Sequence, residues 1–168
     1  MRKIIIGLLI FGLTIQTYAQ VDKIVELPEV VIHAVNYKYI SSVNSEDTDI
    51  SVALLEQKVA NYDIKDADVY VDEFKLYNVS FYIPDGYILA AYDGEGRILH
   101  TIEKFKNSKL PASVMATITK EYPGWEISRN IYRVNYSITQ GTKKRYKFTL
   151  DNGYERIKVK IDEEGTIL

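Results

Sequence analysis

Apolar residues change along the chain from a helical period to an alternating one, and this change occurs twice. In the first half, apolar side chains three or four residues apart predict a helix over about residues 50–62, which Thr48 or Asp49 could cap. The segment that follows alternates between apolar and polar positions, which predicts strands. These strands cover residues 69–83, 88–92 and, as a further strand or a connector, 97–105.

The second half has the same order of patterns. Leu110-Pro111 begins a predicted helix with Val114, Ile118 and Tyr122 on its inner face, and Pro123-Gly124 ends it. Alternating segments then predict strands at 125–127, 132–138, 146–150 and 157–161.

Short segments of the two halves also match each other. Phe81–Tyr87 is similar to Phe148–Tyr154, and Asp93–Leu99 is similar to Asp162–Leu168. The alternative to a repeat is a chance similarity of two turn-containing hairpins, but a helix precedes the matching segments in both halves. We therefore predict a tandem duplication of about 60–70 residues, with a first repeat at 48–105 and a second at 106–168.

The first nineteen residues have the layout of a cleavable export signal. Arg2 and Lys3 form a basic start, residues 4–15 are almost continuously apolar, and Thr17 and Ala19 fit the small-x-small cleavage pattern. A membrane anchor is the alternative, but a spanning helix needs about 20 apolar residues. The sequence predicts a signal peptide over 1–19, a periplasmic or secreted protein without a membrane span after cleavage, and an extended arm and linker over 20–47.

Composition narrows the possible functions of the mature chain. The chain contains no Cys, so thiol chemistry is excluded and stability must come from packing and backbone pairing. The formal net charge of −2, which falls further when Arg2 and Lys3 are removed, argues against nucleic-acid binding. The 14 Tyr, against 5 Phe and 1 Trp, predict tyrosine-rich strands.

Few residues are available for catalysis. His33 and His100 are the only histidines, each between strand-like residues, and neither an HExxH nor a GxSxG motif is present. The acidic turns at 93–96 and 162–165 offer two or three oxygen ligands, where a calcium loop supplies about six or more, so we interpret them as hairpin turns. The sequence predicts no catalytic residue, no metal site and no cofactor.

Cations recur on one face of the second-half strands. If Tyr146, Phe148 and Val159 face the helix, the residues between them lie on the opposite, open face of the sheet. The predicted open-face cations are Arg133, Arg145, Lys147, Arg156, Lys158 and Lys160. One interpretation is an ordinary solvated face, and the other is docking of an acidic protein surface, a phosphate-bearing glycan or a lipid headgroup.

The corresponding face of the first half is more apolar and is expected to need cover. It is predicted to carry Phe74, Leu76, Asn78, Ser80 and Tyr82. The segment 27–32 of the arm, the other repeat or a partner could cover it. Phe74 and Tyr82 therefore join the cations as candidate binding residues.

Three motifs in the second half resemble a known family. Leu110-Pro111-x-x-Val114, Tyr122-Pro123-x-Trp125-x-Ile127 and Asp162-x-x-Gly165-x-Ile167 are similar to the PepSY-like, beta-lactamase-inhibitor-like family of small exported bacterial proteins. The resemblance covers 108–168 and extends more loosely over 50–105, where the Pro-x-Trp is missing. It implies an α+β fold in which the helix of each repeat packs on antiparallel strands, and a noncatalytic binding or inhibitory role toward a periplasmic or secreted protein.

Two other classes of function are alternatives to a binding module. An enzyme of the nicotinate-nucleotide adenylyltransferase type is disfavoured because it needs a parallel nucleotide-binding sheet and a His-x-Gly-His phosphate site, which the sequence lacks. An envelope structural protein would need no ligand. The sequence favours an exported module whose partner is another envelope or secreted protein, or an anionic glycan or lipid headgroup.

Overall fold

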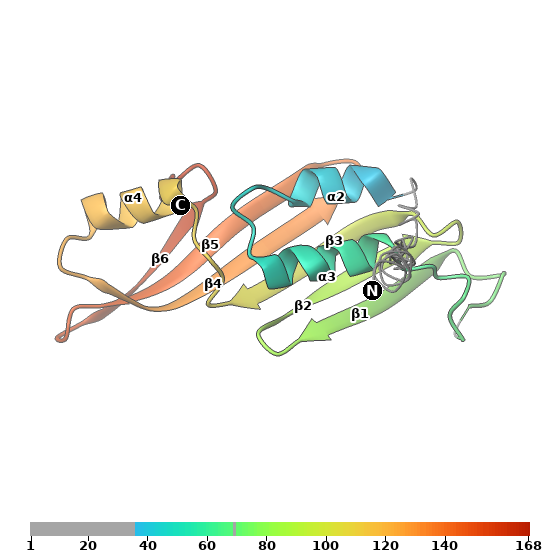
Figure 1. The fold of residues 1–168 in the computed structure, drawn as a ribbon, viewed down its shortest axis with the longest axis horizontal. Helices are drawn as coiled ribbons and strands as arrows, with labels where there is room; N and C mark the ends of the chain where they lie inside the picture. The colour runs from blue at the N-terminus through green and yellow to red at the C-terminus, as the bar shows by residue number, and fades with distance from the viewer. Residues whose placement is uncertain (1–35, 69) are drawn as a thin grey trace, which may run out of the picture. The chain divides into compact units, whose positions relative to one another are not determined.

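The computed structural model describes residues 36–68 and 70–168, all of which belong to one unit. The predicted signal peptide and residues 20–35 of the predicted arm lie outside the described residues. The described chain forms three helices and six strands (Figure 1). In chain order these are α2 (Tyr37–Val43), α3 (Ile50–Ala60), β1 (Leu76–Ile83), β2 (Gly86–Asp93), β3 (Ile98–Lys106), α4 (Ala112–Glu121), β4 (Glu126–Ser137), β5 (Gly141–Asp151) and β6 (Arg156–Asp162).

All six strands form one antiparallel sheet in the order β1-β2-β3-β4-β5-β6. The predicted α+β class with antiparallel strands is therefore confirmed. The segment predicted as a strand or a connector at 97–105 is strand β3, and its pairing with β4 joins the two halves into a continuous sheet. The segments predicted as separate strands at 125–127 and 132–138 both belong to β4, which has an irregularity between Ile127 and Arg129.

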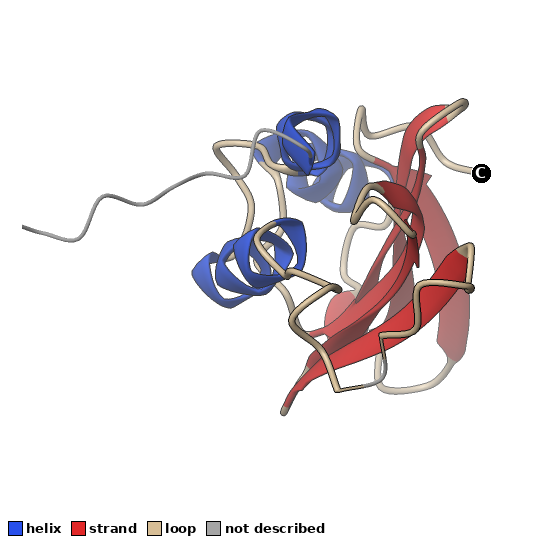
Figure 2. Ribbon diagram, turned by 90° about the vertical axis from the view of Figure 1, so that its right-hand side faces the viewer, coloured by secondary structure: helices blue, strands red, loops and turns tan. Residues whose placement is uncertain are grey.

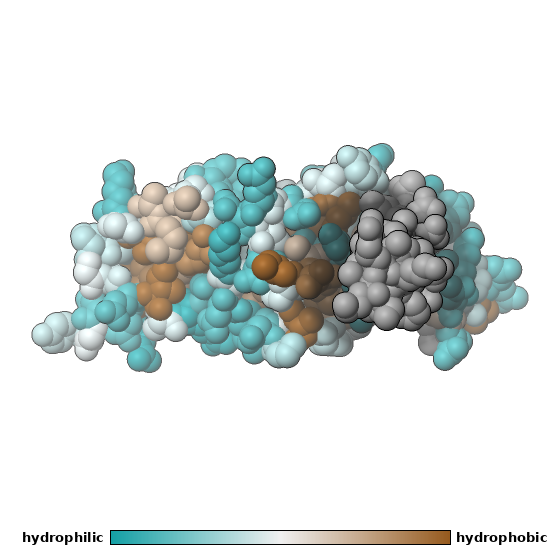
Figure 3. All heavy atoms as spheres, viewed as in Figure 1, coloured by the Kyte–Doolittle hydropathy of each residue, from teal (hydrophilic) through white to brown (hydrophobic). Residues whose placement is uncertain are grey.

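The helices pack on one face of the sheet and leave the other face open (Figure 2). Alternate residues of the strands point into the layer between helices and sheet and are buried there. Tyrosines make up much of this core, and all but Tyr39 of α2 come from strands, in agreement with the predicted tyrosine-rich strands; they are Tyr39, Tyr77, Tyr92, Tyr132, Tyr136 and Tyr146. Seen from the helix side, the surface is mostly hydrophilic, with hydrophobic patches around α4 and near the middle of the view (Figure 3).

Helix α2 corrects the prediction of an extended arm and linker over 20–47. Tyr39 and Val43, four residues apart, are both buried, and the ring of Tyr39 meets that of Tyr136 edge-on at 5.3 Å between centroids. The short helix α2 is too brief to show a strong periodic pattern, and its polar residues Ser41 and Ser42 are typical of a linker. The helix forms because tertiary packing on β4 and β5 stabilises it.

Helix α3 and strand β1 confirm most of the first-half pattern. Asp49 caps α3 by accepting a hydrogen bond from the Ser51 amide at 3.0 Å, and the predicted apolar stripe faces the sheet. Strand β1 begins at Leu76, later than predicted, because a turn closed by a hydrogen bond from Phe74 N to Val71 O interrupts the alternation.

Helix α4 is held against the turn that follows β6. Val114 and Ile118 are buried as predicted, and Tyr122 is half-buried. The Thr117 hydroxyl donates to the carbonyl of Gly165 at 2.7 Å. Gly165 has a positive φ of 92°, and a Cβ there would lie 3.0 Å from the Ser113 carbonyl oxygen, so glycine is required for this close approach.

Candidate functional site

The open face of the sheet carries the candidate binding residues. All six predicted cations are exposed on β4, β5 and β6, between core residues that point to the helices. The strand register adds four further cations to this face, and we call the whole set the basic face. It comprises Lys104 and Lys106 on β3, Arg129 and Arg133 on β4, Lys143, Arg145 and Lys147 on β5, and Arg156, Lys158 and Lys160 on β6.

Several of these cations lie directly opposite one another on neighbouring strands. Lys104 of β3 pairs with Arg133 of β4, which pairs in turn with Arg145 of β5. Lys147 of β5 pairs with Lys160 of β6. Like charges in directly opposite positions destabilise a sheet. The arrangement therefore concentrates positive charge at the expense of the stability of the isolated protein.

Carboxylates neutralise little of this charge. Among the described residues, Arg156 is the one member of the basic face in an ion pair, with its Nε 2.5 Å from Oδ2 of Asp151. That hydrogen bond holds the pKa of Asp151 below its usual value. Asp162 lies opposite Arg145, but its Oδ1 accepts a hydrogen bond from the Thr166 amide at 2.7 Å.

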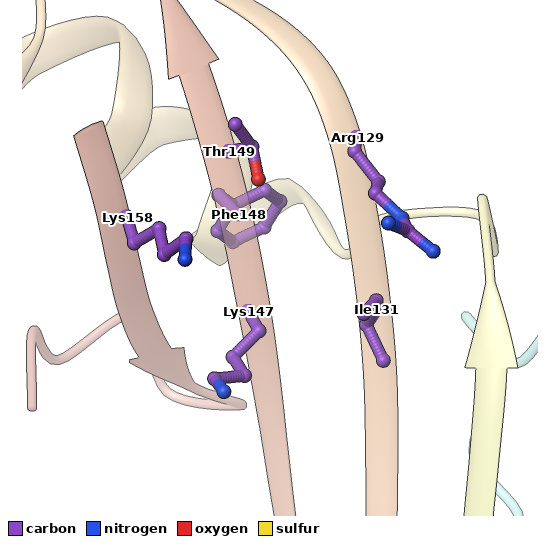
Figure 4. A pocket seen from close by; sticks show the side chains of 6 residues that line it. All are labelled: Arg129, Ile131, Lys147, Phe148, Thr149 and Lys158. Carbon is purple, nitrogen blue, oxygen red and sulfur yellow. The ribbon is translucent and has the colours of Figure 1, made fainter. Parts of the chain in front are cut away.

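A small pocket of about 220 Å³ lies within the basic face (Figure 4). Arg129 of β4, Lys147 of β5 and Lys158 of β6 line it, together with Ile131 and Thr149. Its volume is below the roughly 300 Å³ at which pockets for drug-sized ligands begin. The pocket suits one anionic group, such as a carboxylate, that three neighbouring strands could contact at once.

The part of the open face formed by β1, β2 and Ile102 of β3 is largely uncharged, and we call it the apolar half. Leu76, Tyr82, Leu89 and Ile102 are exposed there, Tyr82 by 70%. The ring of Tyr82 lies 6.2 Å from that of its cross-strand partner Tyr87. Apolar side chains grouped in this way on a surface are typical of a contact area for another molecule.

The structure places one candidate elsewhere. Phe74 was predicted on the open face, but it precedes β1 in the turn described above, so strand alternation does not fix its direction. Its exposed ring lies 6.3 Å from the ring of Tyr77, whose buried side chain belongs to the helix side of the sheet. Phe74 is therefore removed from the candidate site, while Tyr82 remains.

Sequence reasoning missed four members of the basic face. Lys104 and Lys106 alternate with Glu103 and Phe105 and could have been found by the same rule, if 97–105 had been treated as a strand. Lys143 lies before the predicted start of β5. Arg129 was hidden because the β4 irregularity shifts the alternation of apolar residues at that point.

Among the described residues, no group of three or more His, Asp or Glu could hold a metal ion. His100 is exposed on β3 and pairs in register with Ser137, while His33 lies outside the described residues. None of the described helices is both long and apolar enough to cross a membrane.

Fold and surface together define an α+β protein with a six-stranded antiparallel meander, helices on one face and an open face divided into basic and apolar parts. Comparison of the chain with known protein families, with curated proteins and with solved structures found no match.

Proposed function

We propose that the protein is a noncatalytic binding module that docks an acidic surface of an envelope or secreted protein on the open face of its sheet. The observation that carries the proposal is the cross-strand pairing of like charges, Lys147 with Lys160 and Arg133 with Arg145. An anionic partner placed over these rows would replace repulsion with attraction. The opposition of charges would then favour the complex over the free protein.

The apolar half of the face favours a protein partner over a glycan or a lipid headgroup. Protein interfaces are enriched in Tyr and Arg and have an apolar centre beside a polar rim. Tyr82, Leu89 and Ile102 lie on the same face as the cations. Ile102 of β3 pairs with Asn135 of β4, which pairs in turn with Lys143 of β5, so the apolar half adjoins the basic face. A partner that bound through phosphate or sulfate groups alone would leave this apolar half without a contact.

The order of elements supports the proposed tandem duplication and a PepSY-like, beta-lactamase-inhibitor-like relationship. In each half one helix, α3 or α4, is followed by three antiparallel strands. The N-terminal pattern of basic, apolar and small residues supports export to the periplasm or the medium. An inhibitory role would follow if the docked surface included a functional site of the partner.

A charge-reversal experiment tests the basic face. The variant Lys147→Glu/Lys158→Glu changes two residues that line the pocket. The matched control Lys58→Glu/Lys65→Glu changes net charge by the same amount at exposed positions outside the basic face. The probe is fluorescently labelled poly-glutamate, followed by polarisation over a salt series, and the second readout is the set of proteins captured from the envelope extract.

We expect wild type and control to bind the probe with a strong dependence on salt, and the pocket variant to bind at least about tenfold more weakly. Proteins captured by wild type and control should be absent from the variant. Equal binding by the variant and the control would show that net charge, and not this face, controls association. Captured proteins that persist with the variant would remove the basic face from the proposed function.

A further inference from the structure

Two carboxyl groups are buried together between the helices and the sheet. Glu56 of α3 is 0% exposed and Glu103 of β3 is 1% exposed. The cross-strand neighbours of Glu103 are Ile88 and Val134, both fully buried, so the pair lies in an apolar layer. Carboxylates are almost never found in such a position without a cation or full hydrogen bonding.

Hydrogen bonding satisfies only one of the four carboxyl oxygens. Oε1 of Glu103 accepts from the Tyr39 hydroxyl at 2.9 Å and from the Thr101 hydroxyl at 2.7 Å. Oε2 of Glu103 and both oxygens of Glu56 have no donor among the described residues. An arrangement of two ionised groups would therefore bury three unpaired acceptors, which is strongly unfavourable. A proton on Glu56 turns one of those acceptors into a donor.

No cation among the described residues is placed to balance two charges. Lys144 of β5 is the cation whose charge lowers the pKa of both carboxyls, but its Nζ forms an ion pair with Oε2 of Glu163 at 3.1 Å. The other titratable groups facing the pair are Tyr39 of α2 and Tyr132 of β4. Burial raises the pKa of both of these tyrosines, so they are neutral at ordinary pH.

Burial, followed by the charge of the neighbouring carboxyl, raises the pKa of Glu56 to about 8. Burial also raises the pKa of Glu103, but the hydrogen bonds from Thr101 and Tyr39 oppose that rise. Of the two groups, Glu56 is therefore the one that keeps its proton to the higher pH. Geometry and electrostatics assign the same roles, with Glu56 as the donor and Glu103 as the acceptor.

We infer that Glu56 stays protonated in the folded protein at neutral pH, donates to Glu103, and so forms a proton-dependent latch that holds helices α2 and α3 on the sheet. Loss of this proton would place two negative charges in a sealed apolar layer. Water could reach them only if α3 separated from the sheet. The latch thus closes at acidic and neutral pH and loosens at alkaline pH.

The sign of the pH dependence follows from linkage. The pKa of Glu56 is raised above its unfolded value of about 4.5, so folding takes up a proton between that value and about 8. The stabilisation is fully present below the unfolded pKa and is lost as pH rises through the folded pKa. The unfolding equilibrium constant should therefore rise at least about tenfold per pH unit across this window, because Glu103, whose pKa is also raised, adds to the change in its lower part.

The first test measures urea unfolding from pH 5 to 8 for wild type, Glu56→Gln and the control Glu126→Gln, which removes an exposed carboxyl on β4. We expect wild type and the control to show this change, and Glu56→Gln to show a change about tenfold smaller per pH unit, because only the contribution of Glu103 remains. The amide that this substitution introduces can still donate to Glu103 without titrating. An unfolding constant of wild type that does not change with pH, or a slope in Glu56→Gln that equals that of wild type, would overturn the inference.

The second test needs no variant and covers the case in which Glu56→Gln fails to fold. Carbon NMR of the side-chain carboxyl groups follows the protonation of Glu56 directly in the folded protein, and ionisation complete below about pH 6 would overturn the inference. Hydrogen exchange then compares protection of α3 amides at about pH 6 and pH 9, with α4 amides as the internal reference. We expect protection to fall in α3 and not in α4, and an equal fall in both helices would exclude a local latch.

Discussion

Reversing the charge of Lys147 should stabilise the isolated protein while weakening its binding. Lys147 lies between Ile131 of β4 and Lys160 of β6, so Lys160 is its one directly opposite charge. The substitution Lys147→Glu replaces a repulsive cross-strand pair with an attractive one. Each kind of pair contributes roughly 0.2–1 kcal/mol. Both side chains are exposed, so we expect a gain in the free energy of unfolding of about 0.5–1 kcal/mol.

Thermal unfolding followed by circular dichroism can detect a gain of this size. For a domain of this length it corresponds to a rise in Tm of about 1–4 °C. The matched control is Lys143→Glu on the same strand and face, because Lys143 lies opposite Asn135 and beyond the paired end of β6. The control should change Tm by less than about 1 °C. In 1 M salt, where the screening length is about 3 Å, the difference between the two variants should nearly vanish.

Two results would refute this reasoning. A Tm of Lys147→Glu that is equal to or below that of wild type would show that cross-strand repulsion is absent. An equal rise in the Lys143→Glu control would assign the gain to net charge. If Lys147→Glu is more stable and also binds the acidic probe less well, the same side chain favours binding and opposes folding, as the proposed function requires.

Four further substitutions test the packing of the fold and the capping of α3. The Asn36 side chain donates from Nδ2 to the carbonyls of Ala60 (3.0 Å) and Gly96 (3.1 Å), and its Oδ1 accepts from the Ile98 amide (2.8 Å). Asn36→Ala removes all three hydrogen bonds and should lower the free energy of unfolding, measured in urea, by about 2–3 kcal/mol. Gly86→Ala should lower the free energy of unfolding by about 2–3 kcal/mol, because a Cβ there would lie 2.7 Å from the Lys104 carbonyl oxygen and against the Phe105 ring. The control Gly124→Ala, which has open space around it, should lower it by only about 1 kcal/mol. Asp49→Ala should lose about 1 kcal/mol at pH 7. Since the hydrogen bond from Ser51 lowers the pKa of Asp49, this difference from wild type should shrink as pH falls below about 4 in an acid-unfolding series.

Elements with long periodic patterns were predictable from the sequence. The apolar stripe of α3 and the alternation in β5 and β6 gave the correct faces, because one face of each element is buried and the other is solvated, although β5 begins at Gly141, before the predicted start at Tyr146. Helix α2 was not predictable, since seven residues with two buried positions, Tyr39 and Val43, give too little periodicity. Its formation depends on strands β4 and β5, which lie far away in sequence.

The candidate site, like the fold, was predictable from the sequence only in part. Strand alternation identified the cations of β5 and β6, but not their register, and the opposition of Lys147 and Lys160 needed the structure. The pairing of Glu56 with Glu103 was also beyond the sequence. Glu56 lies among apolar residues on the buried face of its helix, which is a signal in the sequence, but only the packing of α3 on the sheet shows that its carboxyl meets that of Glu103.

The meander has a consequence for how the chain folds. Strands that follow each other in the chain pair with each other, and most of the contacts between elements lie in these pairs. Such local contacts require little loop closure and favour rapid folding. A chain that emerges N-terminus first could therefore add each new strand to the edge of a sheet already formed. The bond from Tyr39 to Glu103 spans 64 residues and must wait for β3, so helix α2 docks after the first half of the sheet exists.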